Sequence, residues 1–255
     1  MHGLINQSGP TISAIIITYN EEKNLRACLQ TLKFCHEVVI VDRDSSDRTV
    51  AVASEFNVRV YSRPDWKGFG VQKQRCLELA SGDWIVSLDA DERISANLAR
   101  EILTAINSEL HTGFLIKRQT FFLGKRLRFG GWSDETIIRL ARKSHARFDE
   151  SQVHEKLLIE GSIGNLKSPL LHFSYQDFDD IFEKTKRYAL AAGRRKGALP
   201  KWAGAPVGLA YSIATFVLRY FVKFGFLDGV QGLMAAAMKS QEAFWKHVAR
   251  TLRDK

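Results

Sequence analysis

The stretch that decides the fold is Trp84-Ile85-Val86-Ser87-Leu88-Asp89-Ala90-Asp91-Glu92, in which an apolar run ends abruptly in three carboxylates. A near-continuous apolar run is typical of a strand that is buried on both faces of a parallel sheet. In open α/β sheets, ligands bind just beyond the carboxyl ends of such strands. We therefore expect Asp89, Asp91 and Glu92 to lie at a sheet edge that forms a binding site.

Carboxylates this close together repel one another unless a cation or a proton relieves them. Hard oxygen ligands beside phosphate suit Mg²⁺ or Mn²⁺, so the cluster points to a metal-bound, phosphorylated substrate. The same acids would also suit the start of the following helix, because Asp and Glu are favoured at its positive end. The cluster alone leaves both interpretations open.

The residues before this stretch alternate between strand and helix patterns. β-branched apolar runs at residues 13–19, 37–42 and 58–62 are followed by helical spacing, as at Leu25, Cys28, Leu29 and Leu32. Four strands alternating with three helices predict a parallel, doubly wound sheet. Neither G-x-G-x-x-G nor a Walker A sequence occurs, so a metal on Asp91 is the candidate holder of the phosphate.

Three motifs follow successive predicted strands, and together they carry a family resemblance. They are Thr18-Tyr19-Asn20-Glu21-Glu22, then Val41-Asp42 with Ser45, Ser46 and Asp47, then Leu88-Asp89-Ala90-Asp91. Over residues 12–175 the chain resembles the family 2 glycosyltransferases, whose fold is the Rossmann-like nucleotide-diphospho-sugar transferase fold called GT-A. Within that family, residues 65–70 and 153–157 look like those of bacterial lipopolysaccharide inner-core β-1,4-glucosyltransferases.

The resemblance implies a role for each matching residue. Contacts to the nucleotide sugar would come from Thr18, Tyr19, Asn20, Glu21, Asp42, Lys73, Asp89 and Ala90. Among these, Asp42 would reach the uracil, Asp89 would lie near the ribose, and Lys73 would face the phosphates. Asp91 would bind the divalent metal on the diphosphate. The usual Ser-Gly after the second-strand Asp is replaced by Arg43-Asp44, which leaves the identity of the base open.

Simpler explanations exist for several of these residues. Turn and cap chemistry would account for Asp42 and Asp47 without any ligand, and Asp47 could cap the helix that follows it. Trp66 and Phe69 could pack under their loop, or an exposed aromatic ring could stack on a sugar.

An inverting transfer needs one general base near the acceptor hydroxyl. In the family an acid after a Gly/Trp-rich loop often serves, and Asp134 stands in that place; Glu155 and Glu135 are the alternatives. Asp134 could instead be an N-cap. Trp132 and His154 join Trp66 as acceptor-side candidates, although His154 could equally be structural. His154-Glu155 does not begin an H-E-x-x-H zinc site, because Leu158 stands where the second His would be.

Composition and charge set limits on the partners. The 255 residues carry a formal net charge of +9, which favours an anionic partner. Nucleic acid is not expected, since the sequence has no helix-turn-helix, RNA-recognition or zinc-finger pattern. Three cysteines without C-x-x-C spacing argue against a disulfide framework or a zinc site. The first ten residues do not resemble a secretory signal, so we expect a cytoplasmic protein.

The composition changes after Tyr175. We expect a tail at residues 1–11, a catalytic domain at 12–175 and a helical appendage at 176–255, interrupted by a Pro/Gly-rich break at 196–206. The apolar run 207–218 is shorter than the roughly 20 residues that span a bilayer. Its neighbourhood is rich in Arg, Lys and aromatic residues, which suits an anionic membrane surface. The appendage is therefore expected to hold the enzyme peripherally on the inner face of the inner membrane.

The sequence thus predicts a glycosyltransferase that moves a hexose with inversion, from a nucleotide-sugar donor to a lipid-linked saccharide. The resemblance specifies glucose from UDP-glucose, a heptose of nascent lipopolysaccharide core as acceptor, and Mg²⁺ or Mn²⁺ as cofactor. One alternative is transfer to a polyprenyl phosphate, and a more distant one is transfer to a peptide thiol. Another is a non-catalytic membrane scaffold of the same fold. The nucleic-acid-binding alternative rests only on the basic charge.

Overall fold

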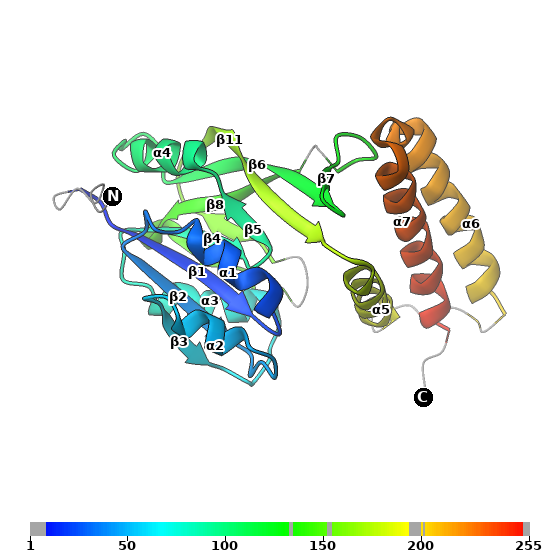
Figure 1. Ribbon diagram of the computed structural model, residues 1–255, viewed down its shortest axis with the longest axis horizontal. Coiled ribbons are helices and arrows are strands. Elements are labelled where there is room, and N and C mark those ends of the chain that lie inside the picture. Colours follow the sequence, from blue (N-terminus) through cyan, green and yellow to red (C-terminus); the bar gives the residue numbers. More distant parts are fainter. Residues whose placement is uncertain (1–8, 133–134, 152–154, 194–199, 201, 252–255) are drawn as a thin grey trace. The chain divides into compact units, whose positions relative to one another are not determined.

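The computed structural model describes residues 9–132, 135–151, 155–193, 200 and 202–251. The chain forms two compact units, Met1–Arg118 with Glu135–His172 and Gln119–Asp134 with Phe173–Lys255 (Figure 1). Two long strands, β6 (Gly113–Phe122) and β11 (Ile163–Tyr175), contribute residues to both units. Boundaries between the two units therefore fall inside these strands. The expected domain boundary after residue 175 stays a prediction.

The first half of the sheet is parallel, as the alternating pattern predicts. Its strands are β1 (Ile12–Thr18), β2 (Glu37–Asp42), β3 (Arg59–Ser62) and β4 (Trp84–Asp89), in the order β3-β2-β1-β4. The register pairs Thr18 with Asp42 and Ile17 with Asp89. The carboxyl ends of three neighbouring strands therefore meet at one edge, which brings the three family motifs together.

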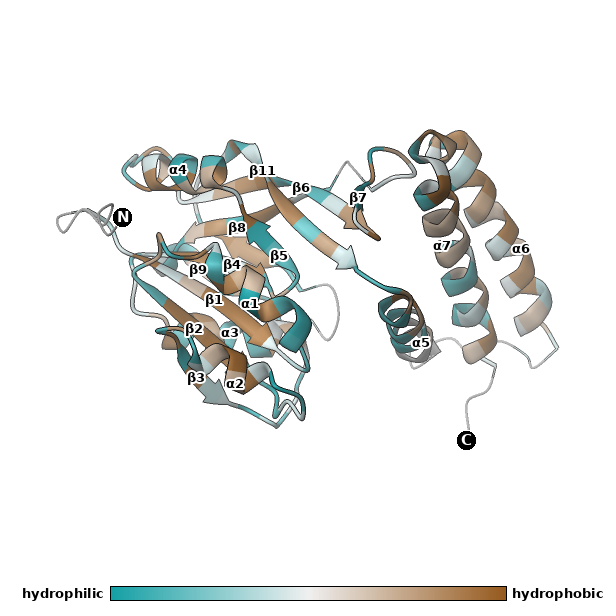
Figure 2. Ribbon diagram, in the orientation of Figure 1, coloured by the Kyte–Doolittle hydropathy of each residue, from teal (hydrophilic) through white to brown (hydrophobic). Residues whose placement is uncertain are grey.

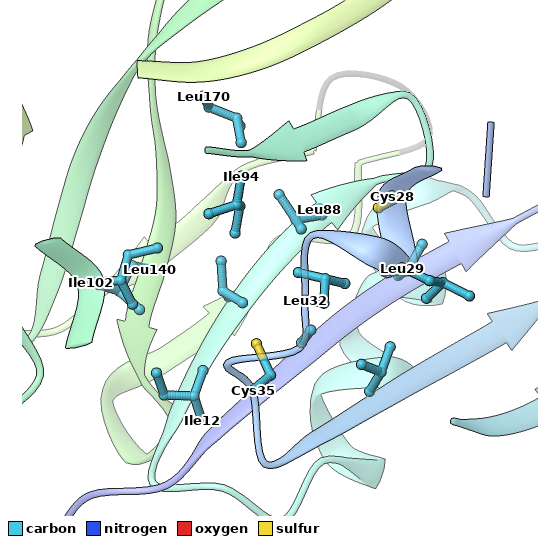
Figure 3. Packing of buried hydrophobic residues seen from close by; sticks show 14 of the residues in the cluster. Ile12, Cys28, Leu29, Leu32, Cys35, Leu88, Ile94, Ile102, Leu140 and Leu170 are labelled. Atoms are coloured by element: carbon cyan, nitrogen blue, oxygen red, sulfur yellow. The ribbon is translucent and has the colours of Figure 1, made fainter. Parts of the chain in front are cut away.

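Alternate residues of these strands bury two separate cores, because successive side chains of a strand point to opposite faces. On one face, Ile12, Ala14 and Ile16 pack with residues of α1 (Glu22–Gln30), α2 (Thr49–Ser54) and α4 (Ala96–Ala105), as Figure 3 shows in part. On the other face, Ile15 packs with Cys76 and Leu77 of α3 (Phe69–Leu79). Helices thus cover both faces, which explains the continuous apolar runs.

The second half of the sheet is antiparallel, and it contains a strand that the sequence pattern does not reveal. The nine-stranded sheet continues β4-β8-β6-β11-β5, with β8 at Thr136–Arg142, β5 at Glu92–Ile94 and β7 (Lys125–Arg126) on β6. Strand β5 pairs with β11. The helix-start interpretation of the acid cluster is therefore wrong: α4 begins at Ala96, and Ser95 caps it by accepting a hydrogen bond from the Leu98 amide at 3.2 Å.

A small hairpin completes the first unit. Strands β9 (Ala146–Phe148) and β10 (Leu157–Ile159) pair antiparallel, after the short helix η1 (Lys143–His145). Phe148 and Leu157 pack in the same core as α3. The residues that flank the connection between the two strands are thereby anchored on the α3 side of the sheet.

Helices make up most of the second unit. They are α5 (Phe178–Gly193), α6 (Gly204–Val217), η2 (Leu218–Val222), η3 (Gly225–Asp228) and α7 (Gly229–Ala249). The helical stretch Gly204–Val222 has 19 residues and is longer than the expected apolar run. An 18-residue window within it has a mean hydropathy of 1.4, and 6% of that window is buried. It therefore has the length and composition of a spanning helix, although it packs along α7 within the unit. Figure 2 shows α6 largely in hydrophobic colours.

All three cysteines are buried and unpaired. Cys28 and Cys76 are inaccessible to solvent, whereas Cys35 keeps 8% of its surface. Burial raises the pKa of the Cys28 and Cys76 thiols to about 12, because the thiolate loses its hydration. Each thiol therefore behaves as a small apolar side chain of the core.

Candidate active site

The turn after β2 is built around a buried carboxylate. Asp42 is 2% exposed, and its Oδ1 accepts hydrogen bonds from Thr18 Oγ1 at 2.6 Å and Ser45 Oγ at 2.7 Å. Its Oδ2 accepts the Ser45 amide at 2.8 Å. A nucleotide base that reached Asp42 would therefore meet a carboxylate whose oxygens already accept hydrogen bonds from Thr18 and Ser45. The predicted contact with uracil stays a prediction.

Further hydrogen bonds tie the turns after β1 and β2 to each other. Asn20, at a positive φ of 54°, donates its amide to Ser45 Oγ and accepts the Ser46 amide on Oδ1, each at 2.9 Å. The Glu21 amide donates to Thr49 Oγ1 at 2.7 Å. Asp47 accepts the Thr49 amide at 2.9 Å, but the N-cap position of α2 is occupied by Arg48, so Asp47 lies one residue before the cap. The first two motifs therefore form one cross-linked platform.

An arginine that the sequence marks only as a departure from the family stands over this platform. The Arg43 guanidinium carbon lies 4.9 Å from the Tyr19 ring centre and 4.7 Å from the Trp66 ring centre. Tyr19 is half exposed. Trp66 also meets Phe69 edge to face, with ring centres 4.8 Å apart. A cation between two aromatic rings joins the β1 turn to the loop before α3, so Trp66 does more than pack under its own loop.

Asp89 is shared between two buried cations. Its Oδ1 accepts Lys73 Nζ at 2.8 Å, and its Oδ2 accepts Arg139 Nη2 at 2.6 Å. Burial opposes ionisation of Asp89, but the charges of Arg139 and Lys73 outweigh it and hold the pKa well below its usual range. Lys73 is 2% exposed and also contacts Glu155 Oε1 at 2.6 Å. The predicted phosphate ligand Lys73 therefore links two carboxylates.

Arg139 extends this network to strand β5. Its Nη2 also donates to Glu92 Oε1 at 2.8 Å, and Glu92 is fully buried. Glu92 Oε2 accepts the Asp89 amide at 3.0 Å. Arg118 Nη1 lies 3.5 Å from Glu92 Oε1, and its other nitrogen pairs with Glu135. Alternating charges thus run from Glu155 to Glu135, and they fix the side of Asp89 that faces the sheet.

The backbone between the two aspartates is held by Arg93. Its Nη1 donates to the Ala90 carbonyl at 2.6 Å and its Nη2 to the Asn24 carbonyl at 2.8 Å. Arg93 is 8% exposed. The Ala90 carbonyl therefore already accepts a hydrogen bond from a buried guanidinium, which holds the backbone between Asp89 and Asp91 in place.

Asp91 lies beside a histidine that belongs to none of the three sequence motifs. His172 Nε2 is 3.4 Å from Asp91 Oδ2, and the side chains keep 12% and 15% of their surface. The β5–β11 pairing aligns His172 with Glu92, next to Asp91, and the sequence gives no signal of this register. Within the described ranges no cluster of three or more potential metal ligands occurs. A carboxylate and an imidazole fit a divalent ion whose other ligands are phosphate and water oxygens.

The acceptor-side candidates belong to different parts of the chain. Trp66 and Glu155 lie in the first unit, whereas Trp132 lies in the second, 6.3 Å from the Tyr175 ring centre. Asp134 and His154 lie outside the described residues. Their predicted roles stay predictions.

The profile of glycosyl transferase family 2 matches residues 13–160, more than half of the chain. Over 94% of both chains, the sequence is 29% identical to the lipopolysaccharide core biosynthesis glycosyltransferase LpsC of Rhizobium meliloti. An uncharacterized glycosyltransferase of Rickettsia typhi is 28% identical over 88% of this chain and 82% of its own.

A solved structure is similar in fold. The crystal structure of S. aureus TarS 1-349 in complex with UDP-GlcNAc gives a TM-score of 0.50 at 15% identity, over 89% of this chain and 79% of that one. The expected GT-A fold is thereby confirmed. With its motif residues gathered at one sheet edge, the chain belongs to glycosyl transferase family 2 and is a glycosyltransferase.

Proposed function

We propose that this enzyme transfers glucose from UDP-glucose, with inversion, to a heptose of nascent lipopolysaccharide core. The acceptor is supported by LpsC, which is named for lipopolysaccharide core biosynthesis and matches this chain along nearly its whole length. The observation that carries the donor side is that Asp42 ends β2 and Asp89 ends β4, the two strands that flank β1, with Asp91 two residues after Asp89. This is the sheet edge at which open α/β folds bind nucleotides.

The metal would be held by Asp91, with His172 as a second ligand, because their side chains lie 3.4 Å apart. A bound Mg²⁺ or Mn²⁺ would supply Lewis-acid neutralisation of the leaving diphosphate. Asp89 would keep its orientation through Lys73 and Arg139, and it would accept hydrogen bonds from the ribose on its exposed side. The cations beneath it would add positive potential to the floor of the donor site.

Asp134 is the proposed base, and its competitor Glu155 is less suitable. Glu155 contacts the buried Lys73 ammonium at 2.6 Å. This oxygen is already engaged by Lys73, so it is less free to contact an acceptor hydroxyl. Asp134 would take the proton of the acceptor hydroxyl as that oxygen attacks the anomeric carbon from the face opposite the diphosphate.

The second unit would hold the enzyme at the membrane surface, peripherally and on the cytoplasmic side. Helix α6 exposes Leu209, Tyr211 and Ile213, each more than half exposed, to the surroundings. A large exposed apolar surface marks an interaction site. The proximity of basic residues such as Lys223 suits anionic lipid, so the lipid-linked acceptor would be met where it is anchored.

The donor is tested by isothermal calorimetry with a panel of nucleotide sugars, with and without Mn²⁺. We expect one donor to bind with the metal, and Asp91→Ala to weaken this binding at least about 100-fold, the loss of a charge-assisted contact in a partly buried site. Asp44→Asn, which changes an exposed carboxylate of the neighbouring turn, is the matched control and should bind normally. If no donor binds, the result favours the non-catalytic scaffold alternative. That alternative predicts that Asp91→Ala still complements a deletion strain.

The acceptor class is tested by Asp134→Asn. A sugar hydroxyl needs a base, so transfer to core saccharide should fall about 100- to 10,000-fold. A polyprenyl phosphate is already an anion and needs none, so that transfer should persist. The measurement is transfer of radiolabelled sugar to each acceptor. If Asp134→Asn transfers sugar to the polyprenyl phosphate while the wild-type enzyme transfers none to the core saccharide, the polyprenyl-phosphate alternative is favoured.

A further inference from the structure

The connection between α6 and α7, residues 218–230, forms a compact turn that we call the hairpin tip. Phe224 and Gly229 adopt left-handed φ values of 57° and 66°. A Cβ on Gly232 would lie 1.9 Å from the Gly225 carbonyl oxygen, so the two backbone segments are in direct contact. Such close packing makes the tip a single rigid piece rather than a loose loop.

The hairpin tip carries exposed apolar side chains. Val222, Phe224 and Val230 keep 61%, 55% and 67% of their surface. Exposed Arg128 and Lys223 belong to the same unit, close to this surface. Apolar side chains bordered by cations match the two layers of an anionic bilayer surface, its acyl boundary and its phosphate head groups.

The hairpin tip is hydrogen-bonded to residues 123–132, which we call loop 123–132. Asp228 is 3% exposed and precedes α7, yet its side chain makes no hydrogen bond to that helix. Instead its Oδ2 accepts the amides of Arg128 and Phe129, each at 2.9 Å. Asp at a helix N-terminus usually caps its own helix, so this carboxylate has been diverted to a distant segment.

Further contacts fasten the same loop. Gly130 donates its amide to the Lys223 carbonyl at 2.8 Å, and its carbonyl accepts Arg219 Nη1 at 2.8 Å. Lys125 Nζ donates to the Asp228 carbonyl at 2.6 Å. The Arg219 guanidinium lies 5.5 Å from the Trp132 ring centre. Backbone groups of loop 123–132 thus find their partners on the hairpin tip.

We propose that Asp228 is a positioning residue that couples lipid contact at the hairpin tip to the conformation of loop 123–132. The loop leads within two residues to Asp134, so the coupling would make transfer depend on an anionic membrane. This consequence rests on the proposed function, in which Asp134 is the base. A tip that is seated in lipid separates from the loop less often, so the hydrogen bonds that join tip and loop are broken less often as well.

The coupling is measured without activity by hydrogen exchange of the full-length protein, read on peptides that cover residues 123–132. Vesicles of phosphatidylglycerol and phosphatidylethanolamine are compared with phosphatidylcholine vesicles and with buffer. In wild type, anionic vesicles should slow exchange of the Arg128 and Phe129 amides. Asp228→Ala should abolish this slowing and speed exchange about 10- to 100-fold, as expected for losing hydrogen bonds to a charged acceptor.

Two further variants separate coupling from folding and from lipid binding. Asp228→Asn keeps an oxygen that accepts both amides, so it should restore most of the protection. Val222→Ser with Phe224→Asn removes apolar surface, and Asn tolerates the left-handed conformation; this variant should lose vesicle binding and with it the vesicle-dependent protection. If Asp228→Ala does not fold, Lys125→Met removes another contact between the loop and the tip, the hydrogen bond from Lys125 Nζ to the Asp228 carbonyl. This variant should weaken the protection of the loop amides more mildly.

Transfer is then measured on the lipid-linked acceptor with the same vesicles. Asp228→Ala should still bind vesicles and still bind the donor, but it should lose vesicle stimulation and show a lower kcat with an unchanged donor KM. Vesicle-dependent protection that is identical in wild type and Asp228→Ala would overturn the coupling. If the wild-type protein binds no donor, the proposed function is overturned. The coupling between tip and loop is then judged from the hydrogen-exchange result only.

Discussion

Asp89 carries a charge that the fold itself neutralises from two directions. Lys73 reaches one oxygen and Arg139 the other. A carboxylate fixed in this way has a defined direction and a defined ionisation state before any substrate arrives. Such preorganisation avoids the cost of rearranging charges during reaction.

Asp89→Asn should destabilise the protein at neutral pH by about 1–3 kcal/mol, less than for a fully enclosed pair because Asp89 keeps 36% of its side-chain surface. The folded-state pKa of Asp89 is depressed, so the stability that its charge contributes is present above the unfolded-state pKa of about 3.9 and is lost as the pH falls toward the folded value. Urea unfolding from about pH 7 to about pH 3 should therefore show the gap between wild type and variant closing only below about pH 4.

The control for this experiment is Asp65→Asn. Asp65 also pairs with an arginine, Arg75, but 54% of its side chain is exposed. Solvent screens such a pair, so little change in stability is expected at any pH. An equal effect of both substitutions would contradict the special role of the buried cations.

Some site residues could be foreseen from the sequence and others could not. Asp42 and Asp89 each end an apolar run, so their place at the sheet edge follows from the pattern alone. His172 meets Asp91 only through the β5–β11 register, and Arg43 finds Tyr19 and Trp66 across separate loops. Contacts between segments far apart in the chain leave no local periodicity, which is why the sequence motifs do not include His172.

At the scale of elements, α3 is seated by a glycine contact. A Cβ on Gly70 would lie 1.8 Å from the Asp149 carbonyl oxygen, and the Gly70 amide donates to the Ser151 carbonyl at 3.1 Å. The segment that it touches leads in sequence to Glu155. The helix that carries Lys73 and the loop that carries its partner are therefore held together at this point.

Gly70→Ala should push these two segments apart and destabilise the protein by about 1–3 kcal/mol, the usual cost of overpacking. Because Lys73 and Glu155 lie on the separated segments, donor affinity should fall as well. Thermal unfolding and donor calorimetry measure the two effects. Gly9→Ala, whose nearest added contact would be an ordinary 3.6 Å, is the control; a neutral Gly70→Ala would mean that the segments can move without harm.

The elements themselves were predictable where one pattern dominates. The parallel strands and α1 were foreseen from apolar runs and helical spacing. Strand β5 was not, because Glu92-Arg93-Ile94 is short and two of its three residues are charged. Its charges are buried only because Arg139 and the backbone around Ala90 lie opposite them, and tertiary partners of this kind override local propensity.

At the scale of the whole molecule, the formal net charge of +9 has a measurable consequence. We expect the protein to co-sediment with phosphatidylglycerol vesicles and to be released in large part when salt rises from about 0.1 M to about 0.5 M, since the electrostatic share of binding is screened. Phosphatidylcholine vesicles should retain much less protein at low salt. Salt-insensitive binding to both kinds of vesicle would indicate insertion driven by the apolar surface alone.

The burial of the three thiols makes the natural chain a ready background for site-directed labelling. Thiolates, not thiols, react with maleimides and nitroxide reagents, and the pKa of Cys28 and Cys76 is raised to about 12. Cys35 is likewise buried and its pKa is raised further. A cysteine introduced at an exposed position such as Val222 would then be the one thiol that a probe reaches in the folded protein. A fluorophore there would report the depth to which the chain enters a lipid monolayer.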